Sequence, residues 1–226
     1  MLAYTKHSNE LVIELEKITE DGALFIHTSR PGVSATSGPG AHCEKRCGAI
    51  HVPPCERFLT PLRIDDLFLD PSTPEKAFRV ETYRSAAVSA AVNAKQLRCY
   101  FVSRCSFPED LSKLNGPNGK VDIRAVSDKA FLDKASENTL DLYQNVMWNV
   151  LERHGPVIEL FEVEGTRERR VVIGYKMGTT QHFFSAISDL YHFYSLYSAR
   201  KYVEQFANGV TIICESIHCA FVIEGS

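Results

Sequence analysis

The sequence lacks a long apolar segment and an excess of basic residues. No run approaches the roughly 18 apolar residues of a membrane-spanning helix, and the start MLAYTK lacks the charged-then-apolar layout of a signal peptide. The 25 Lys and Arg residues are outnumbered by 28 Asp and Glu residues, so the net charge is −3. These absences argue against a membrane protein and against a nucleic-acid partner. We expect an intracellular protein, cytoplasmic or mitochondrial.

The short motifs of catalysis and nucleotide binding are missing as well. The chain contains no G-x-x-x-x-G-K-[ST] phosphate loop, no G-x-G-x-x-G dinucleotide fingerprint, no H-E-x-x-H and no nucleophile elbow. Its histidines lie singly along the chain. The residues alone therefore predict no catalytic and no cofactor-binding residue, and they favour a binding or regulatory module.

Seven cysteines are present, an odd number that argues against a disulfide framework. Cys99, Cys105, Cys214 and Cys219 lie in or beside apolar strand-like runs and are expected to be reduced. Four residues of types that can ligate zinc are spaced four apart: Cys43, Cys47, His51 and Cys55. The spacing is not that of a zinc knuckle, and Pro53-Pro54 disfavours the helix that would align such ligands. We predict a loop with spare thiols and no metal site, these four being the only candidates.

With 44% hydrophobic and 23% charged residues, the composition is that of a globular protein. Alternation and turn signals predict a strand hairpin around Asp21-Gly22 at residues 11–28 and a second hairpin over 157–175. Further elements are predicted from apolar periodicity and caps: strands at 79–85, 97–102 and 210–213, a helix from the Ser127-Asp128 cap to about 154, and a long helix over 181–206 ended by Asn208-Gly209.

From residue 97 onward the predicted order is strand, helix, strand, strand, helix, strand. This is the split β-α-β, ferredoxin-like order of an α+β domain, with both helices on one face of a four-stranded antiparallel sheet. The aromatic stripe Phe184, Tyr191 and Tyr194 is expected to pack on that sheet, and the helix face with Arg200, Lys201, Glu204 and Gln205 is predicted to be an exposed interface. The predicted divisions are an N-terminal hairpin (1–30), a Gly/Pro/Cys-rich linker or insert (31–78), the ferredoxin-like domain (79–215) and an irregular tail (216–226).

The same topology serves RNA-recognition domains, ACT-type amino-acid-sensing domains and structural modules. RNA binding needs exposed aromatics on the central strands and a basic surface. The strand at 170–175 carries too little of that pattern.

Several segments resemble the large fungal-type NAD-specific glutamate dehydrogenases. They are SDLYHFY (188–194), SARKYVEQFAN (198–208), EDGA (20–23), HTSRPG (27–32), LDPSTPEKA (69–77), ETYRS (81–85) and the stretches 97–102 and 156–164, in the family's order. The resemblance covers most of the chain and corresponds to the N-terminal half of those enzymes.

The resemblance implies an ACT-like regulatory and oligomerisation segment, a fragment without the catalytic half. The complete enzyme would oxidise glutamate to 2-oxoglutarate and ammonia with NAD, whereas this chain would hold no catalytic residue and no cofactor. Its expected partners are the C-terminal dehydrogenase half or other subunits of a homo-oligomer, and a small amino acid as effector. The alternative is a free-standing ACT-like amino-acid-binding regulatory protein.

Overall fold

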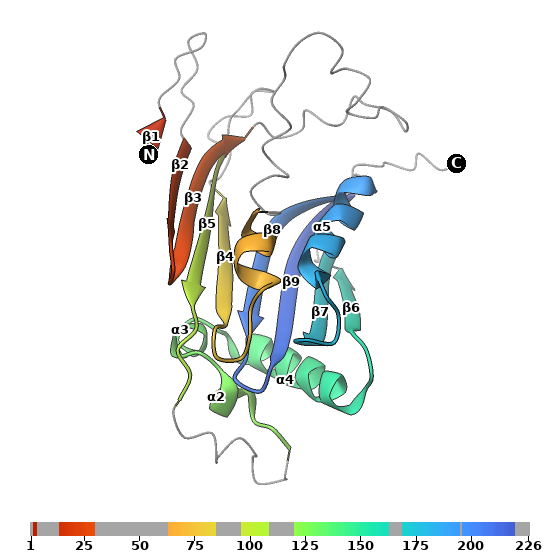
Figure 1. Cartoon of the computed structure of the whole chain (residues 1–226). Helices are drawn as coiled ribbons and strands as arrows, with labels where there is room; N and C mark the ends of the chain where they lie inside the picture. The colour runs from red at the N-terminus through yellow and green to blue at the C-terminus, as the bar shows by residue number, and fades with distance from the viewer. Residues whose placement is uncertain are drawn as a thin grey trace, which may run out of the picture.

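The computed structural model describes residues 2–3, 14–29, 63–84, 96–108, 120–162, 169–194 and 196–219. Within them the chain forms one nine-stranded antiparallel sheet in the order β1-β2-β3-β5-β4-β8-β9-β7-β6 (Figure 1). The strands are β1 (Leu2–Ala3), β2 (Glu14–Thr19), β3 (Gly22–Ser29), β4 (Phe78–Arg84), β5 (Gln96–Arg104), β6 (Val157–Glu162), β7 (Arg169–Lys176), β8 (Leu196–Gln205) and β9 (Val210–Cys219). The helices are the one-turn π-helix η2 (Asp65–Leu69), α2 (Ile123–Val126), α3 (Lys129–Leu132), α4 (Glu137–Glu152) and α5 (Phe183–Phe193). The α+β class is confirmed.

The two predicted hairpins are present. Strands β2 and β3 pair antiparallel about the Glu20-Asp21 turn, with Thr19 opposite Gly22. Strands β6 and β7 pair antiparallel from Val157 opposite Gly174 to Glu162 opposite Arg169. The first hairpin is indicated by an Asp-Gly turn signal and the second by apolar runs on either side of a charged turn. Both signals are local, so the sequence alone predicts these hairpins.

The helical region before β6 is divided where one helix was predicted. Asp128 caps the short helix α3, accepting a hydrogen bond from the backbone N–H of Ala130 at 2.7 Å. The chain then turns, and Ser136 caps α4 by accepting from the backbone N–H of Thr139. The predicted cap residues therefore start a helix, but the main packing helix begins at Glu137.

The predicted helix over 181–206 is wrong in its second half. Helix α5 ends at Phe193, and Leu196–Gln205 form strand β8. Asn208-Gly209 is the turn of a β8–β9 hairpin, in which Gly209 adopts a left-handed φ of 80°. Asn-Gly serves a hairpin turn as readily as a helix end, because both need positive φ. Buried polar residues on β8 hid the two-residue period of the strand.

The four-stranded ferredoxin-like order is not what the sheet shows. Strand β5 pairs with β3 and β4, and β7 pairs with β6 and β9, so β5 and β7 are not neighbours. The extra strand β8, which pairs with both β4 and β9, joins the two halves into one sheet. The predicted order is wrong because residues 181–206 form a helix and a strand rather than one helix.

The helices lie on opposite faces of the sheet, contrary to the prediction that they share one. On β7, Val172 packs with the α4 core, while its neighbour Ile173 packs with the α5 core. Successive strand residues point to opposite faces, so α4 and α5 cover different sides (Figure 1). At Gly174 a Cβ atom would lie 2.5 Å from Cγ1 of Val146, and the missing side chain lets α4 approach the sheet.

Two apolar cores result. The core on the α5 face, which also includes residues under η2, contains Ala23, Phe25, Ile64, Phe68, Leu69, Phe78, Val80, Tyr100, Val102, Ile173, Tyr175, Phe184, Val203 and Ile213. The core on the α4 face contains Ile123, Val126, Phe131, Leu140, Tyr143, Val146, Met147, Val150, Val157, Val172, Phe206, Val210 and Ile212. Of the predicted aromatic stripe, Phe184 is fully buried, Tyr191 is half-buried and Tyr194 is exposed.

Two predicted divisions do not coincide with element ends. Helix η2 packs into the sheet core although it falls in the predicted linker 31–78. Strand β9 continues to Cys219, so residues 216–219 are strand where a tail was predicted. None of the helices in the described ranges is long and apolar enough to cross a bilayer.

Candidate functional site

The zinc-like candidates Cys43, Cys47, His51 and Cys55 lie outside the described residues. Among the residues that the structure describes, no three His, Cys, Asp or Glu side chains gather as a metal site. Cys99, Cys105 and Cys214 are free thiols, as predicted. Burial raises the pKa of the Cys105 thiol far above its usual value, which disfavours the nucleophilic thiolate.

The predicted exposed face with Arg200, Lys201, Glu204 and Gln205 does not exist as a surface. Because β8 is a strand, its residues alternate between the two faces of the sheet. Lys201 and Gln205 point to the α5 side, Glu204 points to the α4 side, and all three are buried. Only Arg200 of the four is exposed. Lys201 and Glu204 thus each belong to a buried polar cluster, one on each face of the sheet.

The first cluster, the α5-face triad, consists of Asp65, Lys201 and Glu215. The Lys201 ammonium lies 2.8 and 2.9 Å from the two carboxylate oxygens of Asp65. It also lies 3.7 Å from Oε1 of Glu215, the residue opposite Lys201 on β9. All three side chains are at most 6% exposed. The Lys201 ammonium is therefore the shared ion-pair partner of two buried carboxylates.

Helix α5 is attached to this triad and to the end of η2. The Ser188 hydroxyl on α5 donates to Oδ2 of Asp65. The Asp70 carboxylate accepts hydrogen bonds from the backbone N–H groups of Phe184 at 3.0 Å and Ser185 at 3.2 Å. These are N–H groups of the first turn of α5, where a carboxylate is stabilised by the helix dipole. The helix is thus fixed over the sheet by polar as well as apolar contacts.

Burial controls the protonation of the triad. It raises the pKa of Glu215 to about 7, although the Lys201 charge opposes the shift. It also raises the pKa of Asp65, again against Lys201. Burial lowers the pKa of Lys201, but attraction to Asp65 and Glu215 outweighs this and the net shift is upward. The Lys201 ammonium therefore stays charged. Its single positive charge can balance only one of the two carboxylates, Asp65 or Glu215.

The second cluster, the α4-face network, centres on Arg79 of β4. Its guanidinium donates to both oxygens of Glu204, at 2.9 and 3.2 Å, and to Glu81 at 2.7 Å. The Lys134 ammonium lies 2.9 Å from both Glu81 oxygens, and the Tyr83 hydroxyl donates to Glu81. Two cations here face two glutamates. The buried Asp128 adds a further negative charge near Arg79 and Glu204.

Burial acts on the glutamates of this network too. It raises the pKa of Glu204 to about 7, with the Arg79 hydrogen bond opposing the shift. Burial also works to raise the pKa of Glu81, but hydrogen bonds from Lys134 and Tyr83 and the Arg79 charge outweigh it, and the pKa falls below its usual range. The network reaches the surface at Lys134, the one largely exposed member of its four charged groups, and at the exposed Tyr83.

A buried amide connects β8 to β4. Gln205 accepts a hydrogen bond from the backbone N–H of Phe78 at 2.6 Å and donates to the Ser72 hydroxyl at 2.6 Å. These polar groups are saturated by one another, so the arrangement stabilises the junction of the two sheet halves. It presents no nucleophile or acid aimed at an open site. The two-residue spacing of Lys201, Val203 and Gln205 is the strand signal that, in a hairpin with β9, would place Lys201 opposite Glu215. It does not indicate the α4-face partners of Glu204.

Comparison with known proteins agrees with the segments identified above. The family model "NAD-specific glutamate dehydrogenase, second domain" matches residues 13–221. The chain is 37% identical over 225 residues to an "NAD-specific glutamate dehydrogenase" of Neurospora crassa, covering 99% of this chain and 19% of that protein. It is 36% identical over 217 residues to the "Probable NAD-specific glutamate dehydrogenase" of Schizosaccharomyces pombe, covering 93% and 18%.

A third relative, "Glutamate dehydrogenase 2" of Dictyostelium discoideum, is 30% identical over 226 residues, covering 90% of this chain and 21% of that protein. No solved structure gives a significant match. The chain thus spans about a fifth of the length of these curated relatives. Since the family model matches nearly all of it, the chain belongs to the NAD-specific glutamate dehydrogenase family and carries the region described as its second domain.

Proposed function

We propose that this chain is a regulatory and oligomerisation segment of an NAD-dependent glutamate dehydrogenase and is inactive alone. The complete enzyme would convert glutamate to 2-oxoglutarate and ammonia, with NAD bound by another part of the polypeptide. The proposal is supported by the small share of each relative that the chain covers. It is also supported by the buried charged side chains, which form ion pairs with one another.

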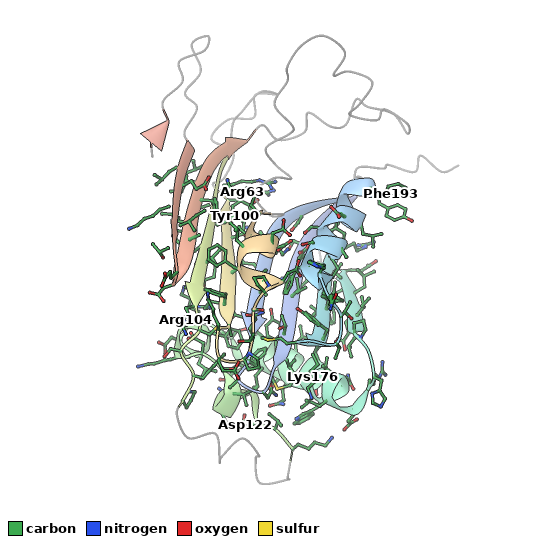
Figure 2. All side chains as sticks on the ribbon, viewed as in Figure 1. Arg63, Tyr100, Arg104, Asp122, Lys176 and Phe193 are labelled. Atoms are coloured by element: carbon green, nitrogen blue, oxygen red, sulfur yellow. The ribbon has the colours of Figure 1, made fainter. Side chains whose placement is uncertain are left out.

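An exposed apolar surface supports a role in assembly. On the edge strand β6, Ile158 and Leu160 are 66% and 65% exposed, and on α5 Phe193 is 76% exposed. Ile158 lies opposite Ile173 of β7, so it faces the same side of the sheet as α5. Figure 2 shows the Phe193 side chain projecting outward at the end of α5. Large apolar side chains exposed on β6 and at the end of α5 favour contact with another protein surface.

We assign this surface, Ile158, Leu160 and Phe193, to contact with another part of the complete enzyme. The occupant follows from the family, because most of each relative's length lies outside the matched region. An ACT-like role as an amino-acid sensor is not part of the proposal, since β5 and β7 are not paired as such a unit requires.

The test uses a complete enzyme that contains this chain as its second domain. Leu160→Ser and Phe193→Ser should reduce the assembled mass measured by light scattering and reduce NADH formation from glutamate. Phe101→Ser is the matched control, because Phe101 is 42% exposed on the opposite face of the sheet. The proposal is contradicted if the Leu160 and Phe193 variants retain both mass and turnover.

A further inference from the structure

The α5-face triad has one more carboxylate than it has cations. Asp65 receives the Lys201 ammonium on both oxygens and the Ser188 hydroxyl on one. Glu215 receives Lys201 only at Oε1 and only at 3.7 Å. Its other oxygen, Oε2, is buried without a hydrogen-bond partner. A buried carboxylate in this position is destabilised by its charge.

The described groups around Glu215 offer no second cation. The residue opposite it on β7 is the apolar Val171, and β8 contributes Lys201 and the Ser198 hydroxyl. Helix η2 contributes the like charge of Asp65. Helix α5 contributes Tyr191, whose buried hydroxyl also has no partner and whose pKa is raised by burial and then by the Glu215 charge.

More distant charges do not change the balance. Asp70 adds a further negative charge near Asp65, and the Tyr100 phenol on β5 acts on Lys201. Arg98, on β5, directs its guanidinium to the Ser198 carbonyl at 3.5 Å. Within the described residues no cationic side chain lies at Oε2 of Glu215, which leaves a proton as the cation that would neutralise it.

We propose that Glu215 is a proton-binding site that controls how firmly helix α5 is held on the sheet. With the proton bound, the triad is neutral and its contacts to α5 through Asp65 and Ser188 are retained. When the proton is lost, a net negative charge is buried beneath α5, and separation of the helix and η2 from β8 and β9 lets water reach it. The inference concerns α5 alone and does not depend on the proposed function.

The direction of the pH dependence follows from the pKa of Glu215 when α5 is closed on the sheet and when it is open. With α5 closed the pKa of Glu215 is about 7, against an ordinary value of 4.5. The closed state therefore binds the proton more tightly, and its advantage is complete below pH 4.5 and is lost as the pH rises through 7. Between pH 6 and pH 8 the equilibrium for closing α5 should weaken by about tenfold.

The test is hydrogen exchange on the 226-residue chain at pH 6 and pH 8, expressed as protection factors so that intrinsic exchange rates cancel. Amides of α5 should lose about tenfold protection between the two pH values, and Glu215→Gln should abolish that loss. Glu204→Gln is the matched control, since Glu204 is equally buried with a pKa of about 7 but lies on the α4 face. It should leave the α5 response intact.

Equal α5 protection at the two pH values, or a pH response that persists in Glu215→Gln, would overturn the proposal. If Glu215→Gln does not fold, infrared spectroscopy of Glu204→Gln supplies the answer, because Glu204 then no longer contributes a carboxyl with a pKa near 7 and the signal comes from the Asp65 and Glu215 pair beneath α5. A neutral-carboxyl band that disappears between pH 6 and pH 8 supports the proposal. Its absence at pH 6 contradicts it.

Discussion

The Lys201 ammonium lies 2.8 Å from Oδ1 of Asp65, although 136 positions separate the two residues in the chain. The contact joins η2 to strand β8 inside the protein. Replacing Lys201 with Met should lower the free energy of unfolding by about 3 to 5 kcal/mol, because Asp65 and Glu215 would remain buried without their cation. Urea denaturation at pH 7.5 measures the loss. The control is Arg200→Met on the exposed neighbouring residue, and equal effects of the two changes would contradict the burial of Lys201.

Arg79 should not tolerate replacement by Lys. Its guanidinium contacts both oxygens of Glu204 and one of Glu81, and an ammonium cannot reproduce that fork. Arg79→Lys should cost about 1 to 3 kcal/mol in the free energy of unfolding. Arg104→Lys, at an exposed pair with Asp21 spaced 3.6 Å, should change it by less than about 1 kcal/mol. Chemical denaturation of the two variants side by side decides the matter, and a cost at Arg79 no greater than at Arg104 would refute it.

The free energy of unfolding should fall between pH 5 and pH 8. Glu204 has a pKa of about 7 in the folded chain and 4.5 ordinarily, so its stabilisation is complete below pH 4.5 and lost as the pH rises through 7. At about 1.4 kcal/mol per pKa unit, the loss from this group is about 2 to 4 kcal/mol. The lowered pKa of Glu81 acts in the opposite sense but below this window.

Urea midpoints at pH 5, 6, 7 and 8 measure this dependence. Glu204→Gln should make the decline shallower, with the remainder carried by Glu215, whose pKa is also about 7. A decline of unchanged slope in Glu204→Gln would show that Glu204 does not titrate in this range.

Gly174 should be the position where α4 is most sensitive to an added methyl group. An alanine Cβ there would lie 2.5 Å from Cγ1 of Val146 and 2.8 Å from Cγ2 of Val150. Gly174→Ala should cost about 1 to 3 kcal/mol by overpacking. Combining it with Val146→Ala should cost less than the sum of the two single changes, because the smaller side chain makes room. Strict additivity in this double-mutant cycle would argue against the contact.

The elements predicted correctly are those whose signals are local. The Asp21-Gly22 turn specified the first hairpin, and the apolar runs at 157–163 and 170–175 specified the second. The strand candidates at 79–85 and 97–102 likewise correspond to β4 and β5 within two residues at each end. Turn chemistry and strand composition act over a few residues, so sequence order was enough.

The elements predicted wrongly depend on distant partners. Lys201, Glu204 and Gln205 look like an exposed helix face until Asp65, Arg79 and Ser72 are brought beside them. Once paired, these polar residues can be buried on both faces of a strand, and no local pattern reports that pairing. The sheet order failed with them, because β8 is the strand that connects β4 to β9.

The proposed function requires that this chain does no redox chemistry alone. The decisive measurement is NADH formation by the purified 226-residue chain supplied with glutamate and NAD, beside a complete glutamate dehydrogenase containing it. We expect no NADH from the isolated chain and turnover from the complete enzyme. Sustained NADH production by the isolated chain would contradict it.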